Sequence, residues 1–178
     1  MDYGLAVALV FVIATAGCAA LPLPFPFQRE ESGSAGGPPF PVLDDGYTDY
    51  VGALHIHTIY SHDAHGTFED VIRVANAQRL DYVVLTEHNN LRALRDGRQG
   101  WYGGTLALIG MEISTRDGHY LAFNVTEEID REALTTQQVI DEVNRQGGFG
   151  FIAHPYFKKA PWKDWTVTGF TGIEAYNV

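Results

Sequence analysis

The chain has 178 residues, of which 46% are hydrophobic and 19% are charged, a composition typical of about one globular domain. Its formal net charge of -10 argues against a nucleic-acid backbone as the main partner, because proteins that bind one carry clustered Lys and Arg. A small phosphate ester remains possible, since a bound metal ion can outweigh the global charge locally. The single cysteine, Cys18, cannot form an internal disulfide.

The N-terminal part of the sequence predicts an export segment followed by a tether. Residues 5–21 are almost wholly apolar and end in small residues around Cys18, which resembles a bacterial lipoprotein signal. Thr15 stands where Leu is usual and no basic residue precedes the apolar run, so an ordinary secretory signal or an uncleaved anchor is the alternative. We expect residues 1–20 to be an export signal or a lipoprotein or membrane anchor, and the protein to be exported, periplasmic or membrane-anchored. Residues 21–48, which include the Gly/Ser/Pro-rich stretch, are predicted to be a flexible linker.

Residues 49–178 are predicted to form the folded domain. Within it, apolar runs predict strands at residues 51–56, 82–85, 106–113, 120–125, 149–153 and 172–176. Helical spacing predicts helices at residues 67–80 and 135–146, with Thr67 and Thr135 as candidate N-caps. This β-α-β-β-α-β order predicts an α/β architecture with mainly parallel strands.

Metal-competent side chains lie at the ends of four of these predicted strands. His55 and His57 close the first, His88 follows the second, Glu112 lies near the end of the third, and His154 follows the strand ending at residue 153. Because the carboxyl ends of strands in such folds meet at one edge, we expect these side chains to converge.

The side-chain directions expected for extended strands support this convergence. Residues two apart share a face, so His55 and His57 can address one ion together. Glu112 lies on the face opposite Met111, and it points to the interior if the Met111 face packs on helices. A buried carboxylate needs a cation, which two or more divalent ions would supply.

The sequence resembles the polymerase and histidinol phosphatase (PHP) superfamily of metallohydrolases. The resemblance extends over roughly residues 53–178 and consists of HIHTIYSHDAHGT, DYVVLTEHNN, GMEIST with the nearby GHY, GGFGFIAHPY and GIEAYN, in that order. It implies a distorted (β/α)7 TIM-like barrel with a two- or three-metal site at the strand ends. The family's further Asp-x-His has no match after His154, and only about six strands precede Val178. We therefore expect an incomplete barrel, and interpret the chain as part of a longer protein.

The resemblance also implies a role for each matching residue. His55 and His57 correspond to first-metal ligands, Glu112 to a carboxylate that bridges to the second metal, and Glu87 and Asn89 to groups that orient imidazoles. A third metal would involve His88 and Asp63, although Asp63 could instead be a simple loop acid. The implied metal ligands are His55, His57, Asp63, His88, Glu112, His119 and His154.

Some of these assignments compete with plainer interpretations. His119 follows a turn-forming Asp-Gly pair, so a solvated turn histidine is the alternative to a second-metal ligand. His62 and His65 lie in a loop, and exposure is the simpler expectation for both. Lys158 is a candidate for binding a substrate anion, with a solvated loop lysine as the alternative.

The predicted function is a metal-dependent hydrolase acting on a small-molecule ester or phosphoester, with no nucleic-acid partner. A phosphoesterase would use two or three divalent Zn, Mn or Fe ions, with a metal-bridging hydroxide attacking phosphorus. Glu112 and His154 would be the catalytic residues of that site. The alternatives are a carbamate, ester or amide hydrolase on the same site, and a non-catalytic metal-binding module.

Overall fold

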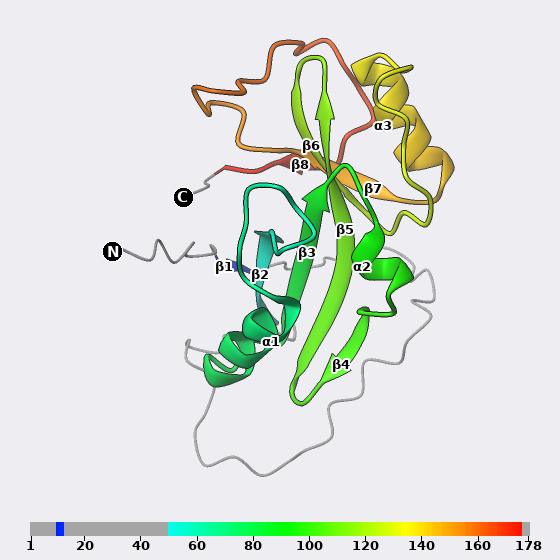
Figure 1. Cartoon of the computed structure of the whole chain (residues 1–178). Coiled ribbons are helices and arrows are strands. Elements are labelled where there is room, and N and C mark those ends of the chain that lie inside the picture. The colour runs from blue at the N-terminus through cyan, green and yellow to red at the C-terminus, as the bar shows by residue number, and fades with distance from the viewer. Residues whose placement is uncertain (1–9, 13–49, 176–178) are drawn as a thin grey trace, which may run out of the picture.

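The computed structural model describes residues 10–12 and 50–175, which form a curled mixed sheet with helices on one face (Figure 1). Most of the predicted export segment and linker, at residues 1–9 and 13–49, lies outside the described residues. Among the residues that are described, no helix is long and apolar enough to cross a membrane. The fold confirms the α/β class and an incomplete TIM-like barrel, because the sheet curls into a half-barrel.

The sheet contains eight strands in the order β1-β2-β3-β5-β6-β7-β8, with β4 paired to β5. The strands are β1 (Val10–Val12), β2 (Val51–Ile56), β3 (Tyr82–His88), β4 (Gly100–Tyr102), β5 (Thr105–Thr115), β6 (Gly118–Phe123), β7 (Phe149–Ile152) and β8 (Gly172–Ile173). The tripeptide of β1 belongs to the segment expected outside the fold, yet it pairs with β2.

The expectation of mainly parallel strands is wrong, because the sheet is mixed. β2 with β3, β3 with β5, and β7 with β8 pair in parallel, whereas β5 with β6 and β6 with β7 pair antiparallel. A turn too short for a crossover joins β5 to β6, and Gly118 begins the returning strand at a φ of 136°. The start of β6 therefore lies at the same sheet edge as the carboxyl end of β5.

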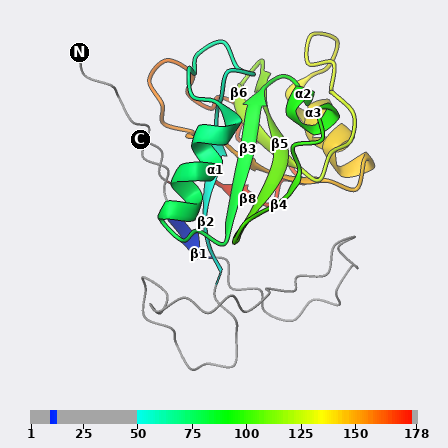
Figure 2. The same ribbon diagram turned by 60° about the horizontal axis from the view of Figure 1, so that its bottom comes forward.

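Two helices begin at the predicted caps and cover the outer face of the sheet (Figure 2). They are α1 (Phe68–Ala77) and α3 (Thr136–Arg145), each started by a capping box, with Thr67 paired to Asp70 and Thr135 paired to Gln138. α1 ends earlier than expected, since Arg79 adopts a φ of 57° that a helix cannot contain. A further short helix, α2 (Arg92–Arg95), and strand β4 were not predicted.

The two faces of the sheet carry different cores. Met111 packs in the cluster that includes residues of α1 and α3, as expected for the face that meets the helices. The opposite, concave face carries a smaller apolar cluster that includes Val84, Leu106 and Leu121. Glu112, 1% exposed, therefore points away from the helices and into the curl of the sheet.

Candidate metal centre

Glu112 lies at the centre of a group of five histidines, and its two oxygens face different members of it. Oε2 lies 3.1 Å from His55 Nε2, 2.9 Å from His57 Nε2 and 3.2 Å from His88 Nδ1. Oε1 lies 2.7 Å from His119 Nδ1 and 3.0 Å from His154 Nε2. The carboxylate thus has one oxygen toward each of two possible ions, the arrangement that a bridging ligand requires.

Each strand end places its side chain as the convergence argument expected, and β6 adds one more. His55 lies in β2, His88 ends β3, Glu112 lies in β5, and His154 follows β7. His119 reaches the same edge from the start of β6 because that strand runs antiparallel to β5. A solvated turn position for His119 is excluded by its 2.7 Å contact with Glu112 Oε1.

The backbone achieves the pairing of His55 and His57 by a route that simple alternation did not predict. β2 carries a register shift against β3 between Ala53 and Ile56, and His55 within it has a φ of 58°. His57 lies beyond the end of the strand, and the two rings lie 5.2 Å apart. A non-glycine residue in the left-handed region costs on the order of 1–3 kcal/mol and is found most often at functional sites.

The donor set fits divalent transition metal ions. Within the described part of the chain, buried His57 Nε2, His88 Nδ1 and Glu112 Oε2 have no hydrogen-bond partner, although they lie close together. Leaving such an atom unsatisfied costs on the order of 1–3 kcal/mol. Coordination would satisfy all three, and a mixture of imidazole and carboxylate ligands suits Zn, Mn or Fe.

Contacts within the cluster shift the pKa values of Glu112 and His55 and so set their charges. Burial opposes ionisation of Glu112, but hydrogen bonds from His119 and His154 hold the pKa of its carboxyl far below the usual range. Burial also opposes protonation of His55, yet contacts with Glu112 and Glu174 raise the pKa of that imidazole to about 9. The metal-free site therefore holds an anionic carboxylate and a protonated His55 at neutral pH.

Metal binding should consequently release protons at neutral pH, and fewer as the pH rises through about 9. His55 must lose its proton to become a ligand, since its pKa is raised to about 9 in the metal-free protein. Burial lowers the pKa of His88, which therefore contributes little to this release. Calorimetric titrations with Zn²⁺ in buffers of different ionisation enthalpy, at pH 7 and pH 9.5, measure the proton number. An equal number at both pH values would contradict the prediction.

Asp63 meets the expected partner His88 and one more. Its Oδ2 lies 3.0 Å from His88 Nε2, and its Oδ1 lies 3.2 Å from His57 Nδ1. These three side chains could hold an ion together, and the role of Asp63 as a third-metal ligand stays a prediction. His62 and His65 are both exposed, as expected, although the His62 ring lies 5.0 Å from that of His88.

Glu87 was expected to contact an imidazole, but its carboxylate contacts the loop after β2 instead. It is fully buried and accepts hydrogen bonds from the hydroxyls of Thr58 at 2.6 Å and Ser61 at 2.5 Å. Ser61 in turn accepts the backbone N–H of His88 at 2.9 Å. The carboxylate therefore fixes the loop from which Asp63 extends, and its influence on the histidines is indirect.

Asn89 connects the ends of β3 and β5, and its influence on the imidazoles is likewise indirect. Its side-chain Oδ1 accepts the backbone N–H of Ser114 at 2.8 Å, and its backbone N–H donates to the carbonyl of Glu112 at 2.9 Å. Asn89 thereby holds the end of β3 against β5 through both its side chain and its backbone, close to His88 and Glu112.

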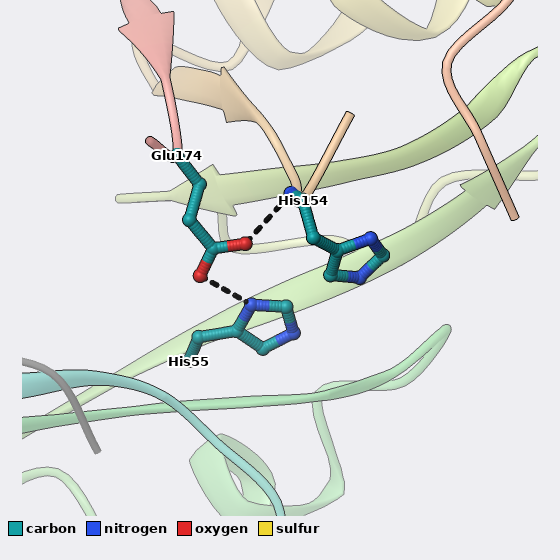
Figure 3. Close-up of side chains that lie close together, drawn as sticks. All are labelled: His55, His154 and Glu174. Carbon is teal, nitrogen blue, oxygen red and sulfur yellow. Dashed lines mark hydrogen bonds and ion pairs between the residues drawn. The ribbon is translucent and has the colours of Figure 1, made fainter. Parts of the chain in front are cut away.

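Sequence reasoning missed one functional-site residue, Glu174. Its Oε1 lies 2.9 Å from His55 Nδ1, and its Oε2 accepts the backbone N–H of His154 at 2.7 Å (Figure 3). The residue directly follows β8, so the strand-end rule that selected the other carboxylate could have found it.

A hollow of about 500 Å³ opens beside the histidine cluster. It is lined by His154, Pro155, Tyr156, Phe157, Lys158, Lys159, Glu174 and Ala175. Lys158 is exposed and is one of the residues that line this hollow.

The curled α/β half-barrel thus carries, at the carboxyl edge of its sheet, a cluster of histidines and carboxylates that could hold metal ions. Residues 53–176 match the PHP domain, and the chain belongs to the PHP domain family.

The chain is similar to three known proteins. An uncharacterized protein of Methanocaldococcus jannaschii is 28% identical over 114 residues, which span 58% of this chain and 66% of that protein. A two-domain protein of Bacteroides vulgatus, whose assignment as a PHP-like metal-dependent phosphoesterase is itself a prediction, matches with a TM-score of 0.47 and 27% identity. That match spans 68% of this chain and 40% of that one. A proposed metal-dependent phosphoesterase of Bifidobacterium adolescentis shares the fold, with a TM-score of 0.53, 16% identity and coverage of 69% and 76%.

Proposed function

We propose that this protein is a metal-dependent phosphoesterase. The observation that carries the proposal is the division of the Glu112 oxygens between two sets of imidazoles, because a shared carboxylate sets two ions close together. The phosphoesterase descriptions of the structurally similar proteins from Bacteroides and Bifidobacterium agree with this class of reaction.

The residues of the chain would hold the metals and position the substrate. His55, His57 and Glu112 would bind the first ion, and Glu112 with His119 and His154 the second. The bound ions would acidify a water molecule and stabilise the charge on the phosphoryl oxygens. The third group, formed by His57, Asp63 and His88, would hold a further ion, because His57 Nδ1 and His88 Nε2 both face Asp63.

The hollow next to His154 would receive the part of the substrate that leaves. Tyr156 and Phe157 offer apolar surface there, and the Lys158 ammonium group offers an attractive charge to an anionic ester. A phosphate monoester or diester carries such a charge, whereas a neutral carbamate or carboxylic ester does not.

Lys158→Ala should raise KM for a phosphoester about 2- to 5-fold and leave kcat nearly unchanged. An exposed ion pair contributes up to about 1 kcal/mol, which corresponds to roughly a 5-fold change in binding. Steady-state kinetics would measure the split, with Lys163→Ala as the matched control because Lys163 is exposed but does not line the hollow. Equal KM increases in both variants, or a fall confined to kcat, would contradict this role.

A substrate panel tests the proposed function directly. The full chain, loaded separately with Zn²⁺, Mn²⁺ and Fe²⁺, would be assayed on aryl phosphate monoesters and diesters, an aryl carbamate and a carboxylic ester. We expect metal-dependent turnover of a phosphoester that chelation abolishes. Turnover of the carbamate or carboxylic ester alone would replace the phosphoesterase assignment, and metal binding without any turnover would favour a binding module.

We further propose that the protein is exported and held at a membrane through its N-terminus. The apolar residues 5–21 and the small residues around Cys18 support this proposal, and both lie largely outside the described residues. Fractionation of cells expressing the full chain and a Cys18→Ser variant distinguishes lipid attachment from simple secretion. Recovery of both forms in the cytosol would overturn export.

A further inference from the structure

Glu174 connects two strands that lie far apart in the sheet. β3, β5, β6 and β7 separate β2 from β8 in the strand order. The curl of the sheet nevertheless brings Glu174, which directly follows β8, within 2.9 Å of His55 in β2 (Figure 3). The carboxylate is 7% exposed, so water competes little for either of its oxygens.

Both oxygens of Glu174 have contacts that a positioning residue would make. Oε1 faces Nδ1 of His55, while Nε2 of the same ring faces Glu112. An imidazole that binds a metal through Nε2 carries a proton on Nδ1, and a carboxylate that accepts a hydrogen bond from this N–H fixes both the tautomer and the ring plane. Oε2 accepts the backbone N–H of His154 instead of facing its ring.

The two residues that Glu174 contacts share an unusual backbone. His55 has a φ of 58° and His154 a φ of 25°, and non-glycine residues rarely adopt positive values. A single carboxylate therefore contacts both of these residues with positive φ. One of these residues faces Glu112 Oε2 and the other faces Glu112 Oε1, so these contacts reach both sides of the centre.

We propose that Glu174 is a positioning residue that sets the His55 imidazole and the His154 backbone, and thereby preorganises both metal positions without binding a metal itself. The inference rests on the proposed metal-dependent function, and it adds a role for a carboxylate outside the predicted ligand set. The alternative is that Glu174 is itself a metal ligand, since His55, His154 and Glu174 are close enough together to hold an ion of their own.

Metal binding by the full chain distinguishes a positioning residue from a ligand. Wild type, Glu174→Ala, Glu174→Gln and Glu174→Asp would be titrated with Zn²⁺ by calorimetry, and bound metal per chain measured at saturation. We expect Glu174→Ala to bind the same number of ions with about 10- to 100-fold weaker affinity. Glu174→Gln should be intermediate, because its amide can accept only one of the two N–H groups and presents a donor to the other.

The Co²⁺-loaded forms provide a second measurement that does not depend on turnover. The visible absorption of Co²⁺ should broaden in Glu174→Ala, as His55 loses its fixed orientation, and Glu174→Asp should restore part of the wild-type spectrum. Glu128→Gln is the matched control, since Glu128 also accepts a backbone N–H, that of Leu91, but touches no imidazole among the described residues.

The possible outcomes separate this inference from the proposed function. Loss of one ion per chain at saturation would make Glu174 a ligand and overturn the positioning role. Unchanged affinity in Glu174→Ala would also overturn the positioning role. If Glu174→Ala fails to fold, Glu174→Gln and Glu174→Asp decide by the same criteria. Wild type that binds metal but hydrolyses nothing would defeat the phosphoesterase proposal, while the affinity series would still test Glu174.

Discussion

Glu112→Gln should abolish phosphoester hydrolysis, with a fall in kcat/KM of at least about 1,000-fold, and should reduce the number of bound metals. The substitution replaces one of two shared carboxylate oxygens with an amide N–H₂ group, which cannot coordinate an ion. It also removes the negative charge that five imidazoles surround. Metal content per chain and kcat/KM for an aryl phosphate, measured on the same preparation, test both parts.

Glu142→Gln is the control for this experiment. Glu142 lies on α3 and forms an ion pair with Arg145. It has no contact with the histidine cluster among the described residues. A Glu112→Gln protein that retained wild-type metal content and turnover would show that the shared carboxylate does not bridge two ions. The same result would remove the central support of the proposed function.

His57→Ala should lower kcat/KM by at least about 100-fold and weaken metal binding, whereas His65→Ala should change neither. Both histidines lie in the stretch HIHTIYSHDAHGT, so comparing the two variants shows whether the place of a histidine, rather than the number of histidines in the stretch, determines activity. His57 directs Nε2 toward Glu112 and Nδ1 toward Asp63, and its side chain is only 14% exposed. His65 is exposed and belongs to the loop before α1.

The measurement is a Zn²⁺ titration followed by kinetics on saturated protein. If excess metal restores full turnover to His57→Ala, the residue contributes to affinity alone, and the catalytic part of the prediction fails. Equal losses in the two variants would mean that the whole loop, rather than the His57 imidazole, supports activity.

The sequence contained enough information for most of the elements and for most of the cluster. Apolar periodicity located both long helices, and the caps Thr67 and Thr135 were correct because capping depends on residues three positions apart. The strand-end rule selected Glu112 and His154, since side chains at carboxyl ends of parallel strands share an edge whatever the loops do.

The remainder depended on interactions that no local pattern encodes. The bulge in β2 that turns His55 to a φ of 58° follows from pairing with β3, not from the residues of β2 alone. The reversal of β6 is an exception, because its Asp-Gly turn is visible in the sequence, and it placed His119 at the edge from the opposite end of its strand. Glu174 could be matched to His55 only once the curl of the sheet was known.

The separation of Glu174 from His55 along the chain has a consequence for how the protein folds. The two residues are 119 positions apart, and His154 and Glu112 are 42 positions apart. Closing loops of this length costs conformational entropy before any contact compensates for it, so the metal positions are completed late in folding. A metal ion bound at this centre adds its binding free energy only to chains whose sheet has already curled. Metal supply would therefore select the folded population, in addition to supporting its chemistry.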